Sequence, residues 1–146
     1  MHDTGGCKYI GLDKEYSIED LAAFHGHLGP NIVIGYRMGR YVRRYFCKDP
    51  FHLTAVIHCS GAPPGSCLVD GIQLGCGCTM GKRNIEIITD SEIKCEFMAN
   101  GKKLVLRPLS LKMPAPGSDH YEELIEQASV DMFRMHDSEL FTAGSN

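Results

Sequence analysis

Two short segments of this 146-residue chain carry side chains that can bind a metal ion. Together they supply two imidazoles, three thiols and a carboxylate: His25, His27, Cys67, Asp70, Cys76 and Cys78. Imidazole nitrogen and thiolate sulfur are the donors that zinc and similar borderline metals prefer. A compact fold that brings the two segments together would therefore create one metal site.

Cys67 is predicted to lie where a thiol ionises easily. Ser66 is a favourable N-cap for a short helix running to about Gln73, so Cys67 is predicted at the helix N-terminus, where the dipole and the free amides favour a thiolate. Asp70 follows one turn later on the same side. We expect its carboxylate to bind the metal, orient a histidine or act as a base.

Composition excludes several classes of protein. A net charge of −3 and a pI near 6.1 give no overall attraction to nucleic acid or anionic lipid, and no apolar run reaches the roughly 18 residues of a membrane span. Residues 1–7 lack the basic and apolar stretches of an export signal. Seven cysteines cannot all pair within one chain, so we expect reduced thiols in a cytoplasmic protein.

Helix signals occur near both ends of the chain. Ser17 and Pro30 each open a helix, and Asp119 caps a last one. On the second helix, Gly35 and Gly39 lie one turn apart and would let a neighbouring element approach closely. Three arginines of that helix are predicted on a face away from its apolar residues: Arg37, Arg40 and Arg44.

Alternating apolar residues predict four strands, over 51–59, 85–89, 92–98 and 103–107. Asp90-Ser91 is predicted to turn the second strand into the third, and Asn100-Gly101 the third into the fourth, which gives a three-stranded meander. The expected fold is therefore α+β, with helices packed on an antiparallel-rich sheet in a single domain over residues 1–146.

The two donor segments resemble the motifs of the FmdE family of formylmethanofuran dehydrogenase subunits. The first motif is His25-Gly26-His27-Leu28-x-Pro30 with Gly35-Tyr36-Arg37. The second is Cys67-x-x-Asp70-x-Ile72-Gln73, followed by Gly77-Cys78-Thr79-x-Gly81-Lys82-x-Asn84. The resemblance covers roughly residues 17–110. It implies an α+β core that forms a close homodimer, with the histidines and cysteines lining a metal-containing cleft.

The chain departs from the family pattern at three points. Gly29 stands where the family usually has a cysteine, and Cys76 where it commonly has threonine. No cysteine follows Cys95, so we expect a core-only member without the carboxyl-terminal zinc finger of longer relatives. The sequence leaves open whether Cys76, or His58 at the end of the first strand, takes the place of the missing sulfur.

The sequence thus predicts zinc or another divalent transition metal held by His25, His27, Cys67 and Cys78, with Asp70 as the catalytic candidate. The family name implies an accessory role beside a molybdenum or tungsten oxidoreductase. Neither a dinucleotide fingerprint nor an iron–sulfur motif is present, so redox chemistry by this chain alone is not expected. The alternatives are a stand-alone metalloenzyme acting on a small molecule, and a metal sensor or carrier. Nucleic-acid and membrane partners are not expected.

Overall fold

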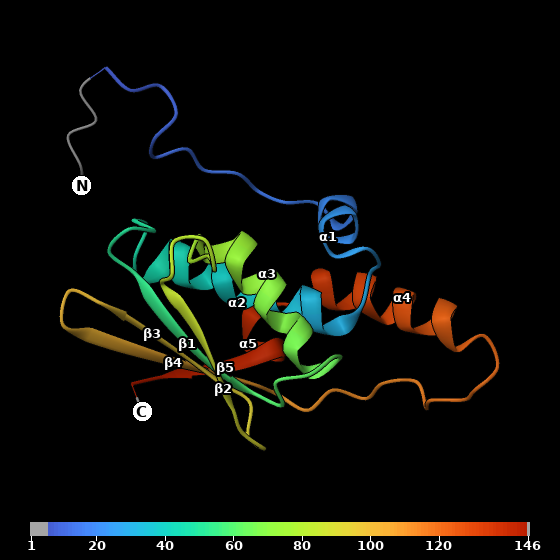
Figure 1. The fold of residues 1–146 in the computed structure, drawn as a ribbon. Helices are drawn as coiled ribbons and strands as arrows, with labels where there is room; N and C mark the ends of the chain where they lie inside the picture. Colours follow the sequence, from blue (N-terminus) through green and yellow to red (C-terminus); the bar gives the residue numbers. More distant parts are fainter. Residues whose placement is uncertain (1–5, 146) are drawn as a thin grey trace.

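A computed structural model describes residues 6–145, so most of the segment 1–7, on which the expected lack of an export signal rests, lies outside the described residues. The helices are α1 (Ile18–His25), α2 (Pro30–Tyr45), the 3₁₀ turn η1 (Gly65–Cys67), α3 (Leu68–Cys76), α4 (Tyr121–Phe133) and α5 (Asp137–Leu140). The strands are β1 (Thr54–Cys59), β2 (Ile85–Thr89), β3 (Lys94–Ala99), β4 (Lys102–Pro108) and β5 (Phe141–Gly144). Helices pack on a largely antiparallel sheet (Figure 1), which confirms the predicted α+β class.

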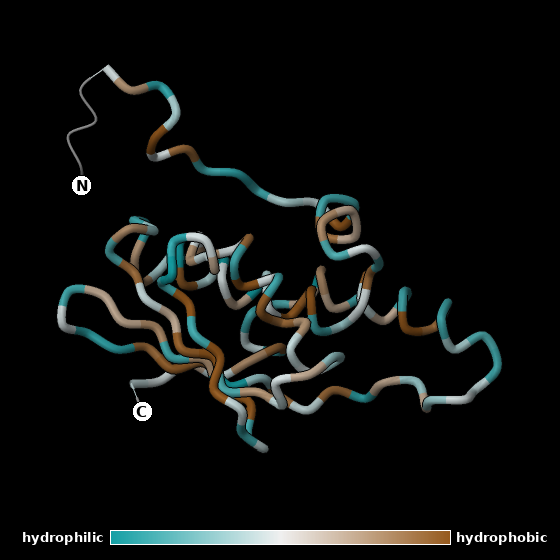
Figure 2. Tube along the Cα trace, in the orientation of Figure 1, coloured by the Kyte–Doolittle hydropathy of each residue, from teal (hydrophilic) through white to brown (hydrophobic). Residues whose placement is uncertain are grey.

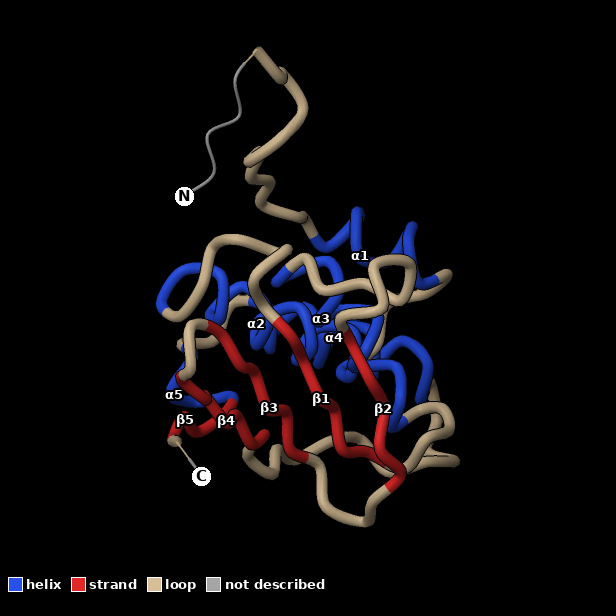
Figure 3. Tube along the Cα trace, turned by 60° about the vertical axis from the view of Figure 1, so that its left-hand side comes forward, coloured by secondary structure: helices blue, strands red, loops and turns tan. Residues whose placement is uncertain are grey.

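The sheet has the order β2-β1-β3-β4-β5, and its strand neighbours differ from the predicted meander (Figure 3). β1 lies between β2 and β3, so the predicted pairing of β2 with β3 through Asp90-Ser91 is wrong. β2 instead pairs in parallel with β1, because the chain crosses over through α3 before it returns to the sheet. The turn at Asn100-Gly101 is confirmed: both residues have positive φ, and β3 and β4 form an antiparallel hairpin around them.

One face of the sheet packs on the helices and forms the core. Along β1 and β3 every second side chain is buried on this face: Ala55, Ile57, Cys59, Cys95, Phe97 and Ala99. Figure 2 shows hydrophobic stretches along the strands beneath α2 and α3. Among the described residues, no helix is long and apolar enough to cross a membrane.

Glycines bring α2 and α3 into backbone contact. A Cβ atom added at Gly35 would lie 2.0 Å from the carbonyl oxygen of Leu68, and one added at Gly71 would lie 2.2 Å from the carbonyl oxygen of Ile32. Any side chain at either position would collide with backbone, which cannot move aside as a flexible side chain can. The close approach predicted from the glycines of the second helix is therefore confirmed, and it holds α3 at a fixed position on α2.

Arg37 is buried, although the sequence pattern placed it on a face of its helix away from the apolar residues. Its side chain is 4% exposed, and its guanidinium donates to the carbonyl oxygens of Phe133 at 2.8 Å and Met132 at 3.3 Å. It also donates to a carboxylate oxygen of Asp137 at 2.9 Å. The Met132 carbonyl also accepts from the amide of Met135 at 3.1 Å, so Arg37 adds to the hydrogen bonds that close the end of α4 and neutralises an acid of α5 at the same time.

The carboxyl-terminal elements also differ from the prediction. α4 begins at Tyr121 with His120, not Asp119, in the N-cap position. The sequence patterns missed both α5 and β5, which closes the sheet beside β4. Each of these two elements has four residues, too few for a periodic pattern to emerge.

Candidate functional site

The first two donors lie at the end of α1. The helix begins with the predicted capping box, in which Ser17 accepts from the amide of Asp20 and the Asp20 carboxylate accepts from the amide of Ser17. It ends at His25, and Gly26 follows with φ of 100°, a left-handed conformation that suits glycine. This turn brings His27 back beside His25, with 5.0 Å between the ring centroids.

Asp70 holds the His25 ring in place. Its Oδ2 lies 2.7 Å from Nδ1 of His25, across the junction between the end of α1 and the first turn of α3. A carboxylate at Nδ1 selects the tautomer that carries the proton there and leaves the Nε2 lone pair for another partner. Of the three roles predicted for Asp70, the structure supports that of orienting a histidine.

Cys67 lies beside this pair, with an acidity opposite to that predicted. Cys67 rather than Ser66 occupies the N-cap position of α3, and its backbone amide donates to the carbonyl of Pro64 at 3.1 Å. Burial of the half-buried thiol, and next the negative charge of Asp70, raise the pKa of Cys67. The expected stabilisation of the thiolate by the helix N-terminus is therefore outweighed in the metal-free protein.

A cavity of about 1000 Å³ adjoins these donors. His25, His27 and Cys67 all line it, so the fold brings together three of the four predicted metal ligands. The remaining wall comes from the start of α2, the segment 107–116 and α4, and is largely apolar. Arg107, which was not predicted as a site residue, also lines the wall and donates through Nε to a carboxylate oxygen of Glu92 at 3.4 Å. An arginine at the end of a strand gives no distinguishing signal in the sequence.

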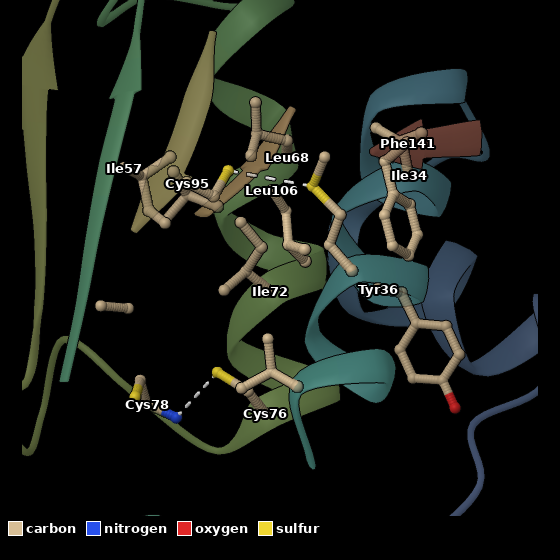
Figure 4. Close-up of a cluster of buried hydrophobic side chains, with 14 of the residues drawn as sticks. Ile34, Tyr36, Ile57, Leu68, Ile72, Cys76, Cys78, Cys95, Leu106 and Phe141 are labelled. Atoms are coloured by element: carbon tan, nitrogen blue, oxygen red, sulfur yellow. Dashed lines mark hydrogen bonds between the residues drawn. The ribbon is translucent and has the colours of Figure 1, made fainter. Parts of the chain in front are cut away.

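Cys78, the fourth predicted ligand, lies at the other end of α3. From Cys67 to Cys76, nine steps along the helix span about 14 Å of its axis. Figure 4 shows Cys76 and Cys78 together in the hydrophobic core, and among the described residues neither thiol lines the cavity at Cys67. The structure thus places Cys78 and Cys76 apart from the two histidines.

The rest of the second motif shapes the turn after α3. Asn84 accepts the amide of Thr79 at 2.9 Å and donates to the carbonyl of Pro50 at 2.7 Å. Lys82 donates through Nζ to the carbonyl oxygen of Gly77 at 2.5 Å and to the hydroxyl of Thr79 at 3.1 Å. These contacts assign a structural role to residues that the sequence grouped with the donors.

His58 belongs to a separate cluster on the outer face of the sheet. Its Nε2 lies 2.5 Å from a carboxylate oxygen of Glu96, which Lys103 also contacts at 2.5 Å. Lys103, followed by His58, lowers the pKa of Glu96 to about 2. His58 is therefore engaged away from the cavity, and the structure does not bring it to the candidate ligands.

A family model described as "FmdE, Molybdenum formylmethanofuran dehydrogenase operon" matches residues 24–142. The chain belongs to the FmdE family. The match begins one residue before His25 and extends into β5, so it covers both donor segments and nearly all the helices and strands. A search of curated proteins gave no match.

The donor atoms of this FmdE chain are of the types that bind a borderline metal, but they do not lie close enough together to bind one ion. Two imidazoles and a thiol line one cavity, and the carboxylate behind His25 provides the outer hydrogen bond that metal-bound histidines commonly have. Among residues 6–145, however, no three His, Cys, Asp or Glu side chains are already grouped closely enough to hold an ion. Binding would therefore require His27 or Cys67 to change its side-chain conformation.

Proposed function

We propose that the protein binds zinc or another divalent transition metal at the cavity, through His25, His27 and Cys67. The observation that carries this proposal is the 2.7 Å contact between Asp70 and Nδ1 of His25, because it presents the other ring nitrogen as an acceptor. Asp70 then acts as a positioning residue. Cys78, which the sequence predicted as a fourth ligand, is omitted because it lies at the opposite end of α3.

Each residue has a defined part in this site. Asp70 keeps the proton on Nδ1 of His25, and the thiol of Cys67, whose pKa is raised, loses its proton when metal binds. A bound divalent metal supplies Lewis acidity and a site for water or substrate at the position that three protein ligands leave free.

Competition titration with a chromophoric zinc chelator tests the ligand set. We expect the wild-type protein to bind about one zinc ion per chain, and Cys67→Ser to lower the affinity by about 100-fold or more, beyond the loss typical of an outer-shell change. Cys78→Ser is the matched control and should keep the wild-type affinity. Melting temperatures of the apo proteins show that each variant folds.

The two variants also discriminate between the ligand sets. Equal loss of zinc affinity in Cys67→Ser and Cys78→Ser would restore the four-ligand site predicted from the sequence. Wild-type affinity in Cys67→Ser would contradict a site at the cavity. Failure of the wild-type protein to bind any transition metal would contradict the proposed function altogether.

We further propose an accessory role beside a molybdenum or tungsten oxidoreductase, with the protein acting as a homodimer. The support for the first is the operon named in the family description. The support for the second is the family resemblance, together with exposed apolar side chains at Leu109, which lines the cavity, and Leu124 on α4. Light scattering should give twice the 16.2 kDa chain mass, and co-purification with the dehydrogenase subunits should survive a salt wash. A monomer would contradict the homodimer, and the absence of co-purification would contradict the accessory role.

The cavity favours a second candidate, a stand-alone metalloenzyme acting on a small molecule. Its volume of about 1000 Å³ is large enough for a small-molecule substrate, and a purely structural metal site needs no such space. X-ray absorption of the zinc-loaded protein would separate an enzyme site from a purely structural one. A zinc-bound oxygen or nitrogen atom that small molecules displace would support the enzyme. Four protein ligands that nothing displaces would support a structural site. Moderate affinity with fast exchange would instead support a sensor or carrier.

A further inference from the structure

Cys76, Gly77 and Cys78 place two thiols side by side at the C-terminal end of α3. Cys76 is 1% exposed and Cys78 is fully buried, and both belong to the hydrophobic core (Figure 4). The pair lies about 14 Å along α3 from Cys67, so it is separate from the proposed metal site. The inference that follows does not depend on that site.

A hydrogen bond joins the two cysteines directly. The amide of Cys78 donates to the sulfur of Cys76 at 3.4 Å, and the Cys78 thiol donates to the carbonyl of Leu53 at 3.5 Å. Gly77 makes this possible: its φ of 86° turns the chain sharply between the two cysteines. A Cβ atom at position 77 would lie 2.8 Å from Cβ of Pro50, so the turn requires glycine.

Positive charge surrounds the same turn. Lys82 binds the carbonyl of Gly77, and the charges of Arg43 and Lys82 both act on Cys76. The hydrogen bonds from Cys78, with these two cations, lower the pKa of Cys76, whereas hydrogen bonding to Cys76 and burial raise that of Cys78. Cys76 is therefore the nucleophile of the pair, with Cys78 as the adjacent thiol that can resolve an oxidised sulfur.

Solvent reaches the turn from one side. A second cavity, of about 450 Å³, is lined by Gly77 together with Arg43 and Lys82. The glycine between the two cysteines thus forms part of the wall that separates them from solvent. Hydrogen peroxide is close to water in size, so a small opening of this turn is sufficient to admit it.

We propose that Cys76 and Cys78 form a reversible disulfide when the protein reacts with hydrogen peroxide. The Cys76 thiolate attacks one peroxide oxygen and breaks the O–O bond, which gives a sulfenic acid and hydroxide. The Cys78 sulfur then attacks the Cys76 sulfur, the S–O bond breaks, and the hydroxyl group leaves as water with the proton of Cys78. The hydroxide takes the proton that Cys76 had released, so two thiols and one peroxide give one disulfide and two waters.

Thiol counting by intact mass tests this proposal. The chain has seven cysteines, so the reduced protein should gain seven N-ethylmaleimide adducts under denaturing conditions. After stoichiometric peroxide we expect two fewer adducts and a mass loss of two hydrogens, both reversed by dithiothreitol. Fragmentation of the digested protein should place the bond between Cys76 and Cys78.

Variants of single cysteines complete the test. Cys76→Ala and Cys78→Ala should each abolish the disulfide, while Cys95→Ala, which removes a buried thiol from β3 of the same core, should leave it intact. Free thiols at both Cys76 and Cys78 in wild-type protein, at peroxide that oxidises the exposed Cys7, would overturn the proposal. A disulfide that maps to Cys67 or Cys47, or one that persists in Cys76→Ala, would overturn it as well.

Discussion

At its N-terminal end α3 presents Cys67 to a cavity that also contains two imidazoles, whereas at its C-terminal end Cys76 and Cys78 are buried against each other. Both ends carry thiols, but their neighbours differ. Cys67 faces a carboxylate and histidines, which suits a divalent metal, and Cys76 faces a thiol and two cations, which suits oxidation.

The difference shows that a cysteine motif does not define one site. Cys67 and Cys78 belong to the same sequence motif, yet α3 lies between them and spans about 14 Å from Cys67 to Cys76. The charge around each sulfur then sets its acidity: the anion Asp70 raises the pKa of Cys67, and the hydrogen bonds from Cys78, with Arg43 and Lys82, lower that of Cys76. Of these groups only Arg43 lies outside the motif, so the end of α3 at which a thiol lies, rather than membership of the motif, sets its surroundings.

The largest expected effect is that of Gly71→Ala, which displaces α3 and therefore disturbs both of its ends at once. The new methyl group would lie 2.2 Å from the carbonyl oxygen of Ile32, so α3 must move away from α2. We expect a loss of about 3 kcal/mol in the free energy of unfolding, the upper part of the range for overpacking. Urea denaturation measures this loss.

Gly81→Ala is the control, because the space around Gly81 is open and its stability should change by less than about 0.5 kcal/mol. Equal stabilities for Gly71→Ala and wild type would show that α2 and α3 are not held by their glycines.

Gly29→Cys should strengthen the N-terminal end alone. Gly29 lines the cavity with φ of −141°, an extended conformation open to any residue, and a Cβ atom there would lie 3.2 Å from the His27 ring, which can move. The added thiol restores the cysteine of the family pattern, and we expect zinc affinity to rise by about 10-fold or more. Gly29→Ser, which adds a similar volume without a thiol, should bring no gain. An unchanged zinc affinity in Gly29→Cys would contradict a metal site beside Gly29.

Asp70→Asn should weaken the N-terminal end in two measurable ways. Zinc affinity should fall by about 10-fold, since His25 loses the carboxylate that orients it. In chelator-treated protein the Cys67 thiol should also titrate at lower pH, because the negative charge that disfavours its thiolate is gone.

The rate of alkylation by iodoacetamide against pH, measured in a Cys7→Ser background, reports this titration. A shift to higher pH, or none, would contradict the placement of Asp70 beside Cys67.

The smallest expected effect is the loss of stability when either thiol is removed from the residues it packs against. Cys78→Ala removes a fully buried sulfur from the core and should cost about 1 kcal/mol, while Cys67→Ala, at a half-buried site beside a cavity, should cost less than about 0.5 kcal/mol. Thermal denaturation of the reduced, metal-free proteins measures both. A larger loss of stability for Cys67→Ala than for Cys78→Ala would contradict the placement of Cys67 beside the cavity and of Cys78 in the core.

Local sequence signals predicted the parts of the fold that depend on neighbouring residues. The capping box at Ser17, the helix start at Pro30 and the turn at Asn100-Gly101 all formed as expected, because each is satisfied by contacts within a few residues. The donors of the site were also recognisable, because His25, His27 and Cys67 occur in motifs of the FmdE family. Residue type and local spacing were sufficient for these conclusions.

Only the tertiary structure decided which distant groups meet. It inserted β1 between β2 and β3, buried Arg37 against the end of α4, and paired Asp70 with His25 while it kept Cys78 away from them. Each result depends on contacts between residues far apart in the chain, and the spacing of residues along one segment does not encode those contacts. Helix length and the packing of α3 on α2 set the distances, and these distances place Cys67 and the pair Cys76 and Cys78 in different surroundings.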